Sequence, residues 1–211
     1  YAKYLKKVHK KDTPIYVFPN YNDVKDFNFK PAKKNKNKIV IGWQGSTTHT
    51  ADLKLVIPAL KEVMNKYPQV ELEFLGGIPK DDVKEIFSAM DDKLFKRIAI
   101  TGGHPAWDKY PELLSTMKWD IGIAPLVNNE FNRGKSHIKW MEYAMYKIPC
   151  VASKVYPYSS NIKPKTGFLA TNTKDWVYKL SQLIESPTMR KEIGTNAYEY
   201  IRDNLQWEQH K

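Results

Sequence analysis

The 211-residue sequence contains a single cysteine, which limits how the fold can be cross-linked. One cysteine excludes an intramolecular disulfide, and no cluster of cysteine and histidine is present for a structural zinc ion. No apolar run approaches the roughly 20 residues of a membrane-spanning helix, and we expect no signal peptide. Residue 1 is Tyr rather than Met, so we expect a trimmed fragment or a processed chain.

Motifs that often mark nucleotide and metal sites are also missing. The turn at residues 42–46 (GWQGS) is neither a GxGxxG motif nor a Walker A loop, because the later glycines and the GK[ST] are absent. The sequence has no DxD and no HxxxH, so a metal that bridges a phosphate to carboxylates has no obvious ligands. We therefore expect no metal and no cofactor other than a substrate.

Positive charge is in excess, but it is unevenly placed along the chain. The 34 Lys and Arg outnumber the 23 Asp and Glu by 11, and a net charge of +11 suggests an anionic partner. Residues 1–38 hold eleven lysines and three aspartates and account for +8, so the other 173 residues carry only +3. The lysine and asparagine run at 33–38 is typical of a solvated linker. Contact of this segment with an anionic surface is the alternative.

Hydrophobic patterning predicts strands that alternate with helices, and 42% hydrophobic content is enough for a folded core. The expected strands are 15–18, 39–43, 70–75, 97–101, 120–125, 150–152 and 167–170. The expected helices are 1–10, 51–67, 80–90, 107–117, 136–146, 174–185 and 188–204, with an Asn-rich loop at 127–132. Short turns that contain glycine join these elements, so we predict an α/β fold with a Rossmann-like, doubly wound parallel sheet. Such sheets bind ligands at the carboxyl ends of their strands.

Polar residues that follow two predicted strands suit a phosphate ligand. Gly45 and Ser46 precede a helix, where glycine allows close approach and the helix N-terminus offers free N–H groups. A tight turn without a ligand is the alternative. Arg133, Lys135 and Lys139 surround the start of a later helix, where cations oppose the helix dipole unless an anion compensates. A solvated charge run is the alternative there.

Glu142 follows Lys135 by seven residues, which is about two helical turns along the same face. A carboxylate at this place could accept both hydroxyls of a ribose, and an ordinary surface glutamate is the alternative. We expect His137 to be a core or capping residue and Cys150 to be a small core residue. We also expect three aromatic side chains to serve packing rather than stacking on a ligand, namely Trp43, Trp119 and Trp140.

The segment that begins at Arg133 resembles a known signature. The stretch RGKSHIKWMEYAM at 133–145, followed by IPCVAS at 148–153, resembles the pattern of retaining GT-B glycosyltransferases of family four (glycosyl transferases group 1). The resemblance extends to IYVFPNYND at 15–23, DIGIAPL at 120–126 and GFLA at 167–170. It spans nearly the whole chain, and the 133–153 block is its most specific part.

The resemblance implies the donor-binding, C-terminal half of a two-domain GT-B fold. Residues 1–38 would be the end of the N-terminal acceptor domain with a basic linker, and 39–186 the nucleotide-sugar-binding domain. Residues 187–211 would form a C-terminal helix that packs back toward the N-terminal domain. The implied reaction is metal-independent, retaining transfer of a hexose-type sugar from a nucleotide diphosphate to a glycan, lipid or protein acceptor.

Roles for single residues also follow from the resemblance. Arg133 and Lys139 would act as catalytic cations on the diphosphate, with Lys135 beside them, and Glu142 would hold the ribose. The other implied donor contacts are Gly45 and Ser46 at the phosphates and Gly103 and His104 at the base.

The sequence departs from the family pattern at three places. One is Tyr21, which stands where the family's PNG segment has glycine. The family's ExxxxxxxE motif would place its first glutamate at position 134, which is Gly here, so Asn128, Asn129 or Glu130 would take over the sugar contact. Position 147 is Lys where the family has glycine. We expect the fragment alone to bind nucleotide weakly and to transfer nothing. We expect a cytoplasmic location, with peripheral contact to an anionic membrane as an option, and no nucleic acid as a partner.

Two other classes of function compete with this interpretation. The first is a non-catalytic Rossmann-like module that binds nucleotide, nucleic acid or an anionic membrane, the last two through its basic tail. The second is a flavodoxin-like regulatory domain, which needs an acidic cluster near the first strand of the body. Residues 39–48 contain no carboxylate, so the sequence disfavours the second class.

Overall fold

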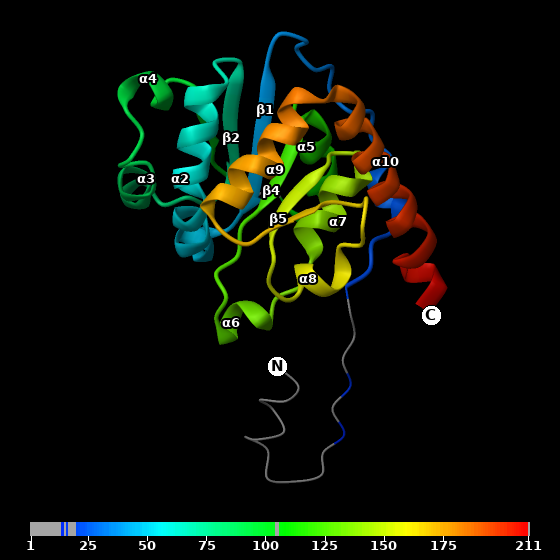
Figure 1. Cartoon of the computed structure of the whole chain (residues 1–211). Coiled ribbons are helices and arrows are strands. Elements are labelled where there is room, and N and C mark those ends of the chain that lie inside the picture. Colours follow the sequence, from blue (N-terminus) through cyan, green and yellow to red (C-terminus); the bar gives the residue numbers. More distant parts are fainter. Residues whose placement is uncertain (1–13, 15, 17–19, 104–105, 211) are drawn as a thin grey trace.

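The computed structural model of the chain describes residues 14, 16, 20–103 and 106–210. Within these residues, six parallel strands form one sheet that has helices on both faces (Figure 1). The predicted α/β class and doubly wound sheet are therefore confirmed. The helix expected at 1–10 and, apart from Tyr16, the strand expected at 15–18 lie outside the described residues.

The order of the strands places the ligand crevice of the fold. The sheet runs β3-β2-β1-β4-β5-β6. Its strands are β1 Ile39–Gly45, β2 Val70–Gly76, β3 Ile98–Thr101, β4 Ile121–Ala124, β5 Cys150–Ser153 and β6 Phe168–Ala170. The chain moves outward from β1 to β3 and then crosses to β4 and moves outward to β6 on the other side. The order reverses between β1 and β4, so a ligand is expected beyond their carboxyl ends.

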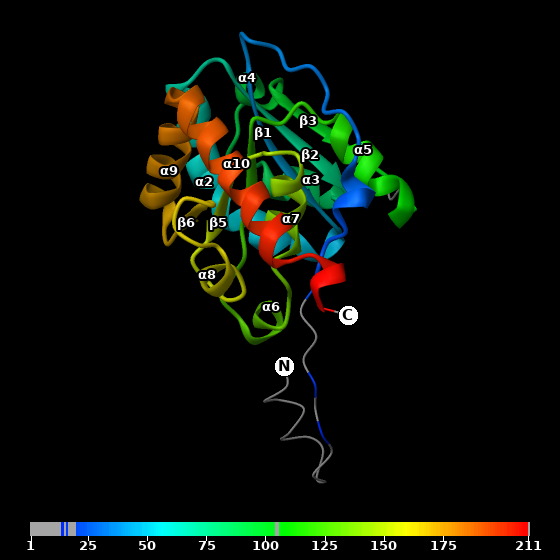
Figure 2. The same ribbon diagram turned by 90° about the vertical axis from the view of Figure 1, so that its right-hand side faces the viewer.

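Two groups of helices cover the two faces of the sheet (Figures 1 and 2). The first face carries α2 Thr50–Lys66, α3 Lys80–Ile86, α4 Asp92–Phe95 and α9 Thr173–Glu185. The opposite face carries α5 Tyr110–Thr116, α7 Ile138–Met145, α8 Tyr158–Asn161 and α10 Pro187–Asn204. The described residues also form α6 Glu130–Arg133 and the 3-10 helices η1 Val24–Phe27, η2 Thr47–His49, η3 Trp107–Lys109 and η4 Trp207–His210.

Most expected elements are confirmed. The differences lie at the ends of some elements and in three short helices that were not expected, α4, α6 and α8. The helix expected at 80–90 ends at Ile86, and the one expected at 107–117 is divided into η3 and α5. The loop expected at 127–132 is wrong in part, because residues from Glu130 form α6 after Asn129 caps it. Ser46 precedes η2 but its side chain makes no capping hydrogen bond, and α2 starts only after His49.

Large aromatic side chains fill the core, and two strand glycines make room for them. Trp43, Trp119 and Trp140 are fully buried, as expected of packing residues. A Cβ on Gly42 would lie 1.9 Å from the ring of Trp119. A Cβ on Gly122 would lie 2.5 Å from the ring of Tyr143. A side chain at either glycine would collide, because protein interiors are close-packed. Cys150 is also buried, and the prediction that it is a core residue is confirmed.

The segment from residue 20 to residue 38 runs along the body of the domain. Asn22 pairs in a parallel bridge with Gln206, beyond the end of α10 (Figure 2). The ring of Phe27 contacts that of Tyr146 with centroids 5.9 Å apart, and the N–H of Ala32 donates to the carbonyl of Ser115. The segment therefore runs from the carboxyl ends of the strands, near the end of α10, to their amino ends, where α5 ends and β1 begins.

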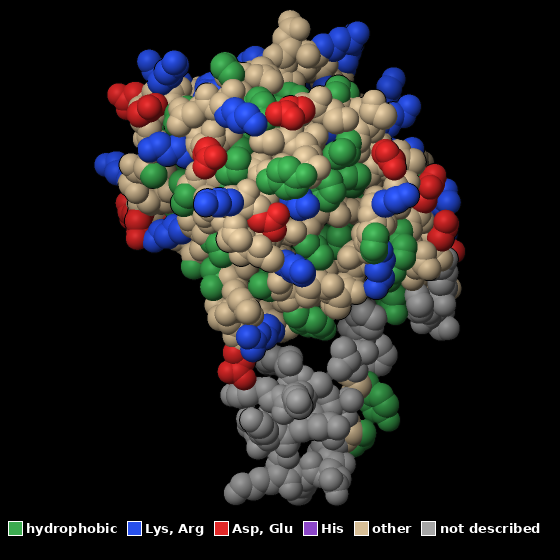
Figure 3. All heavy atoms as spheres, viewed as in Figure 1, with side chains coloured by type: hydrophobic (Ala, Val, Ile, Leu, Met, Phe, Trp, Pro, Cys, Tyr) green, Lys and Arg blue, Asp and Glu red, His purple; other side chains and the backbone are tan. Residues whose placement is uncertain are grey.

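The lysine-rich run at 33–38 is exposed, as expected of a solvated linker. Lys34 makes an ion pair with Asp120, with 3.4 Å between the charged atoms. On the face seen in Figure 3, Lys and Arg side chains are interspersed with Asp and Glu rather than gathered into one patch. The net charge of the chain therefore does not produce a single basic surface on this face.

Candidate functional site

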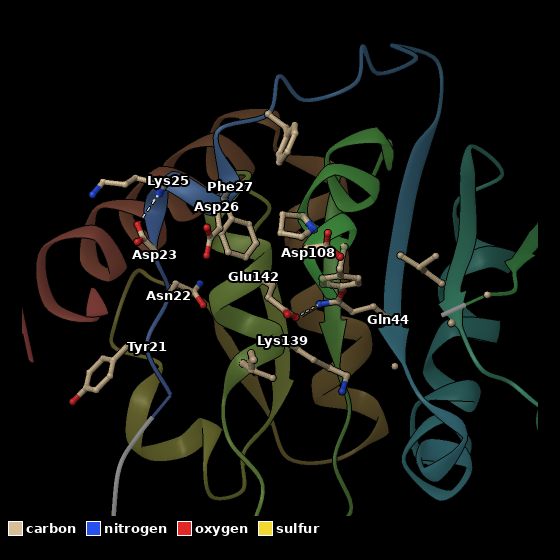
Figure 4. Close-up of a pocket in the computed structure, with 18 residues that line it drawn as sticks. Tyr21, Asn22, Asp23, Lys25, Asp26, Phe27, Gln44, Asp108, Lys139 and Glu142 are labelled. Atoms are coloured by element: carbon tan, nitrogen blue, oxygen red, sulfur yellow. Dashed lines mark hydrogen bonds between the residues drawn. The ribbon is translucent and has the colours of Figure 1, made fainter. Parts of the chain in front are cut away.

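A cavity of about 810 Å³ opens at the carboxyl ends of the strands (Figure 4). Gln44 and Gly45 reach it from the end of β1, and Lys139 and Glu142 reach it from α7. The segment with η1 forms the opposite wall, and α5 contributes Tyr110. The cavity therefore lies at the switch point of the sheet, where the topology predicts a ligand.

Glu142 and Gln44 form a hydrogen-bonded pair in this cavity. The Gln44 Nε2 donates to Glu142 Oε2 at 2.6 Å (Figure 4). Burial raises the pKa of Glu142 to about 7, although the charge of Lys139 and the Gln44 hydrogen bond act in the other direction. Gln44 is only 3% exposed, and among the described residues its Oε1 has no hydrogen-bond partner. The pair thus presents oxygen acceptors to a ligand that carries hydroxyl groups.

Lys139 faces an imidazole rather than a carboxylate. Its Nζ lies 3.1 Å from His49 Nε2. Burial lowers the pKa of Lys139 to about 8, and the charge of Lys135 acts in the same direction, while Glu142 and Asp52 oppose the shift. An anion in the cavity would compensate this partly buried ammonium.

Asp52 is the centre of a buried network behind the cavity. Its Oδ2 lies 2.7 Å from His49 Nδ1 and 3.6 Å from Lys135 Nζ. Its Oδ1 accepts hydrogen bonds from the N–H of Val127 at 2.7 Å and from Asn132 Nδ2 at 2.9 Å. Burial would raise the pKa of Asp52, but the hydrogen bonds from His49 and Val127 and the charge of Lys135 lower it overall. Asp52 therefore joins the start of α2 to the loop after β4.

The helix α6 carries three residues for which the sequence predicts donor contacts. Arg133 is exposed, and its Nε donates to Asn128 Oδ1 at 2.9 Å. Asn129 accepts from the N–H of Asn132 at 2.8 Å as the helix cap, and Glu130 is exposed. None of these side chains lines the cavity in the part of the chain that the structure describes.

The structure brings together about half of the predicted site. Four predicted residues line the cavity, namely Gly45, Gly103, Lys139 and Glu142. Lys135 reaches the network of His49 and Asp52 behind it. Four others do not line it, namely Ser46, Asn129, Glu130 and Arg133. His104 lies outside the described residues. The roles of all these residues stay predictions.

Sequence reasoning missed three residues of the site, Gln44, His49 and Asp52. His49 and Asp52 are three residues apart at the start of a helix, and this spacing places them on one side of it. A pair of a histidine and an aspartate at this spacing after a strand was a usable signal. Gln44 had a different usable signal, because it is a polar residue near the carboxyl end of β1, where sheets of this kind bind ligands.

Two further observations limit the chemistry of the described residues. Within them, no group of three or more His, Cys, Asp or Glu side chains is arranged to hold a metal ion. No helix formed by these residues has the length and apolar character needed to cross a membrane. His137 is buried and burial lowers its pKa to about 4, which agrees with the expected core role.

Comparisons with solved structures place the fold among glycosyltransferases. A variant of S. aureus TarM in complex with fondaparinux, alpha-GlcNAc-glycerol and UDP is 20% identical, with a TM-score of 0.72, over 99% of this chain and 40% of TarM. Anabaena HepE in complex with UDP and glucose is 18% identical, with a TM-score of 0.67, over 89% of this chain and 52% of HepE. The chain thus spans about half or less of these two proteins.

A third solved structure is matched almost from end to end. The C-terminal domain of the glycosyl transferase group 1 protein LpcC from Francisella tularensis is 19% identical, with a TM-score of 0.60. The match covers 90% of this chain and 96% of that domain, so the fold corresponds to a C-terminal GT-B domain. No curated protein sequence matches this chain significantly.

The sequence itself matches a protein family over most of its length. The family model described as "Glycosyl transferases group 1" matches residues 24–200. This range includes the residues that line the cavity from Lys25 onward, on η1, β1 and α7 among others. The resemblance seen in the 133–153 block is therefore confirmed. The chain belongs to the glycosyl transferases group 1 family.

Proposed function

We propose that this chain is the donor-binding part of a glycosyltransferase that moves a sugar from a nucleotide diphosphate to an acceptor without a metal ion. The observation that carries the proposal is that the partly buried ammonium of Lys139 and the buried carboxyl of Glu142 line the same 810 Å³ cavity at the switch point of the sheet. One nucleotide carries both complementary groups, an anionic diphosphate and a ribose with two hydroxyls.

In this proposal the cations hold and stabilise the diphosphate. Lys139 enters the cavity directly, and Lys135 lies behind it near Asp52. When the bond to the sugar breaks, negative charge develops on the departing diphosphate, and cations fixed in a partly buried site stabilise that charge. Arg133 is 2.9 Å from Asn128 and would have to turn toward the cavity to take part.

The ribose and the base would lie on the other side of the cavity. Glu142 would accept from one ribose hydroxyl. The Oε1 of Gln44, which has no partner among the described residues, would supply a second acceptor next to it. Gly103 and Tyr110 line the part of the cavity left for the base. The TarM and HepE structures contain UDP, and this supports UDP as the first nucleotide to test.

The remaining parts of the reaction lie outside the described residues. The acceptor, a glycan, lipid or protein, would bind mainly to a preceding domain, since the chain spans 40% of TarM. Retention of configuration is proposed on the family resemblance, and peripheral contact with an anionic membrane on the positive charge of residues 1–38. A cytoplasmic location is proposed as well. The fragment alone is expected to bind nucleotide weakly and to transfer no sugar.

Calorimetric titration of the chain with UDP, GDP and ADP tests the proposal. We expect saturable binding of at least one nucleotide, and at least tenfold weaker binding for the double variant Arg133→Ala with Lys139→Ala. The matched control is Lys93→Ala with Lys96→Ala, which removes two exposed cations from α4 and its end. The absence of heat with all three nucleotides would contradict the proposal.

The same titrations separate the alternative, a module that binds anions through its basic tail. The variant with Lys33, Lys34 and Lys36 all changed to Gln removes three exposed cations from the linker. The alternative would be favoured if the linker variant lost nucleotide binding while the double variant of Arg133 and Lys139 kept it. Under our proposal the linker variant binds nucleotide as the unaltered chain does.

A further inference from the structure

Two residues that do not line the cavity are connected by hydrogen-bonding contacts to one that does. His49 is 7% exposed and Asp52 is 2% exposed, and neither contributes to the cavity wall. His49 lies between Asp52, which contacts its Nδ1, and Lys139, which contacts its Nε2. The three side chains form a line from the start of α2 to the cavity.

The contacts of His49 determine which ring nitrogen carries the proton. A protonated lysine can only donate hydrogen bonds, so the Nε2 atom that faces Lys139 at 3.1 Å must accept. The proton of a neutral ring is then on Nδ1, which donates to Asp52 Oδ2 at 2.7 Å. Lys135 Nζ lies 3.5 Å from the same Nδ1, and its charge is compensated by Asp52 Oδ2 at 3.6 Å.

The surrounding charges keep His49 neutral. The groups that face its ring are Asp52 from α2, Lys135 and Lys139 from α7 and the residues before it, and the ring of Trp43 from β1. Burial lowers the pKa of His49, the two lysine charges lower it further, and Asp52 opposes them. A neutral ring can accept from Lys139, whereas a charged ring would repel it.

The carboxylate of Asp52 divides its two roles between its two oxygens. Oδ1 anchors the loop after β4 through Val127 and Asn132, and Oδ2 holds His49. A purely structural role would need only the first set of contacts. A substitution that keeps Oδ1 and alters Oδ2 can therefore separate the two roles.

We infer that Asp52 and His49 act as a positioning pair that fixes the tautomer of the imidazole and aims the Lys139 ammonium at a diphosphate in the cavity. The inference rests on the proposed function and adds two positioning residues to it. The pair acts on Lys139, so it should affect only ligands whose phosphate groups contact Lys139. A ligand that has the same base and ribose but no phosphate does not need it.

Asp52→Asn tests the pair with a nearly isosteric change. The asparagine Oδ1 can still accept from Val127 and Asn132, but its Nδ2 now donates toward His49 Nδ1. The ring must then carry its proton on Nε2, which faces the Lys139 ammonium with a donor. We expect about tenfold weaker binding of UDP, in the scale of one lost hydrogen bond to a charged group, and unchanged binding of uridine.

A pair of His49 variants provides the matched control. In His49→Asn the side-chain amide can replace Nδ1 and donate to Asp52, but nothing reaches Lys139. In His49→Gln the amide oxygen can replace Nε2 and accept from Lys139. We expect His49→Asn to weaken UDP binding about tenfold and His49→Gln to restore most of the affinity, with uridine binding equal in both.

The outcomes separate this inference from the proposed function. If the unaltered chain binds none of UDP, GDP and ADP, the proposed function fails and the inference fails with it. If it binds UDP and Asp52→Asn binds UDP equally well, the inference alone is overturned. Equal losses for UDP and uridine would also overturn it. Should Asp52→Asn fail to fold, the His49 pair decides, and equal affinities of Asn and Gln variants overturn the inference.

Discussion

Charged residues at the amino ends of the strands differ from those at the carboxyl ends in how completely they are paired. At the amino ends, the guanidinium of Arg97 donates to the carbonyls of Met64, Tyr67, Pro68 and Val70 at 2.7 to 3.3 Å. These carbonyls belong to the last turn of α2 and the connection to β2, which no longer have helical partners. The charge of Arg97 is used entirely to hold the fold.

At the carboxyl ends, charged groups remain incompletely matched. Lys139 faces an imidazole, Glu142 accepts from an amide, and among the described residues Gln44 Oε1 has no partner. Burial moves the pKa of Glu142 up to about 7 and that of Lys139 down to about 8. Perturbed groups gather at sites that bind or react, whereas satisfied groups stabilise. Under the proposed function, this domain gives up stability at one end of its sheet in order to bind a nucleotide.

The largest effect on stability is expected from Arg97→Met, which removes the hydrogen bonds that the guanidinium donates at the amino ends of the strands. It leaves four carbonyl groups without their donor, and we expect the free energy of unfolding to fall by about 3 kcal/mol. Urea denaturation measures the loss. Arg97→Lys keeps a charge but has fewer donors in a less rigid arrangement, so it should lose about half as much. Nucleotide binding should not change in either variant, and a loss of binding at constant fold would contradict the comparison.

Glu142→Gln should stabilise the fold, because it removes a buried carboxyl at the carboxyl ends of the strands. It should also weaken nucleotide binding. The folded-state pKa of about 7 lies above the ordinary value of 4.5, so the ionised carboxylate destabilises the fold fully above pH 7 and not at all below about pH 4.5. We expect a gain of about 2 kcal/mol at pH 8 that disappears as pH falls toward 4.5. Thermal unfolding at the two pH values measures it.

The exposed Glu112 supplies the control for this variant. Glu112→Gln should change neither the stability difference between pH 8 and pH 4.5 nor the affinity for UDP. A Glu142→Gln protein that is less stable than the unaltered chain at pH 8 would show that the carboxylate contributes to the fold.

The fold was predictable from the sequence because its local signals agree with one another. Uninterrupted apolar runs such as 39–41 alternate with amphipathic helices such as α2, and a parallel sheet is the arrangement that buries both. The short helix α6 was missed, because four residues carry no periodic pattern and the asparagine cap reads equally well as a loop.

The candidate site was predictable only in part, for a physical reason. Lys139 and Glu142 lie on one helix, so their common face follows from the helical repeat. The contact of Lys139 with His49 joins α7 to the start of α2, and no local pattern encodes a contact across 90 residues. The exposure of Arg133 has the same origin, because it depends on where α6 is placed by the contacts of Asn132 with Asp52.

A smaller effect is expected when pH changes the charge of Lys139 and thereby the affinity for nucleotide. Lys139 contacts His49, and its pKa of about 8 is set by burial and by the charges of Glu142, Lys135 and Asp52, so it loses most of its charge as pH rises from 8 to 9. We expect UDP affinity to fall about fivefold over this range, as the protonated fraction of a group with that pKa does. Calorimetry at pH 7, 8 and 9 measures it.

Lys139→Arg separates the titration of the protein from that of the nucleotide. Arginine keeps its charge at pH 9, so the variant should lose less than twofold over the same range. An equal loss in both proteins would assign the pH dependence to the ligand rather than to Lys139.

The smallest effect on stability is expected from Asp120→Asn. It is the same change of residue type as Asp52→Asn, but it lies at the amino ends of the strands instead of near the cavity. Asp120 Oδ2 accepts from the N–H of Val40 at 2.9 Å, and its Oδ1 pairs with Lys34 at 3.4 Å. An asparagine can keep the first contact and loses only a partly exposed ion pair, so we expect a loss of about 0.5 kcal/mol that is reduced by salt. Because neither contact leads to the cavity, UDP binding should be unchanged in Asp120→Asn and weakened in Asp52→Asn. If the two variants changed binding equally, the two ends of the sheet would not differ in function.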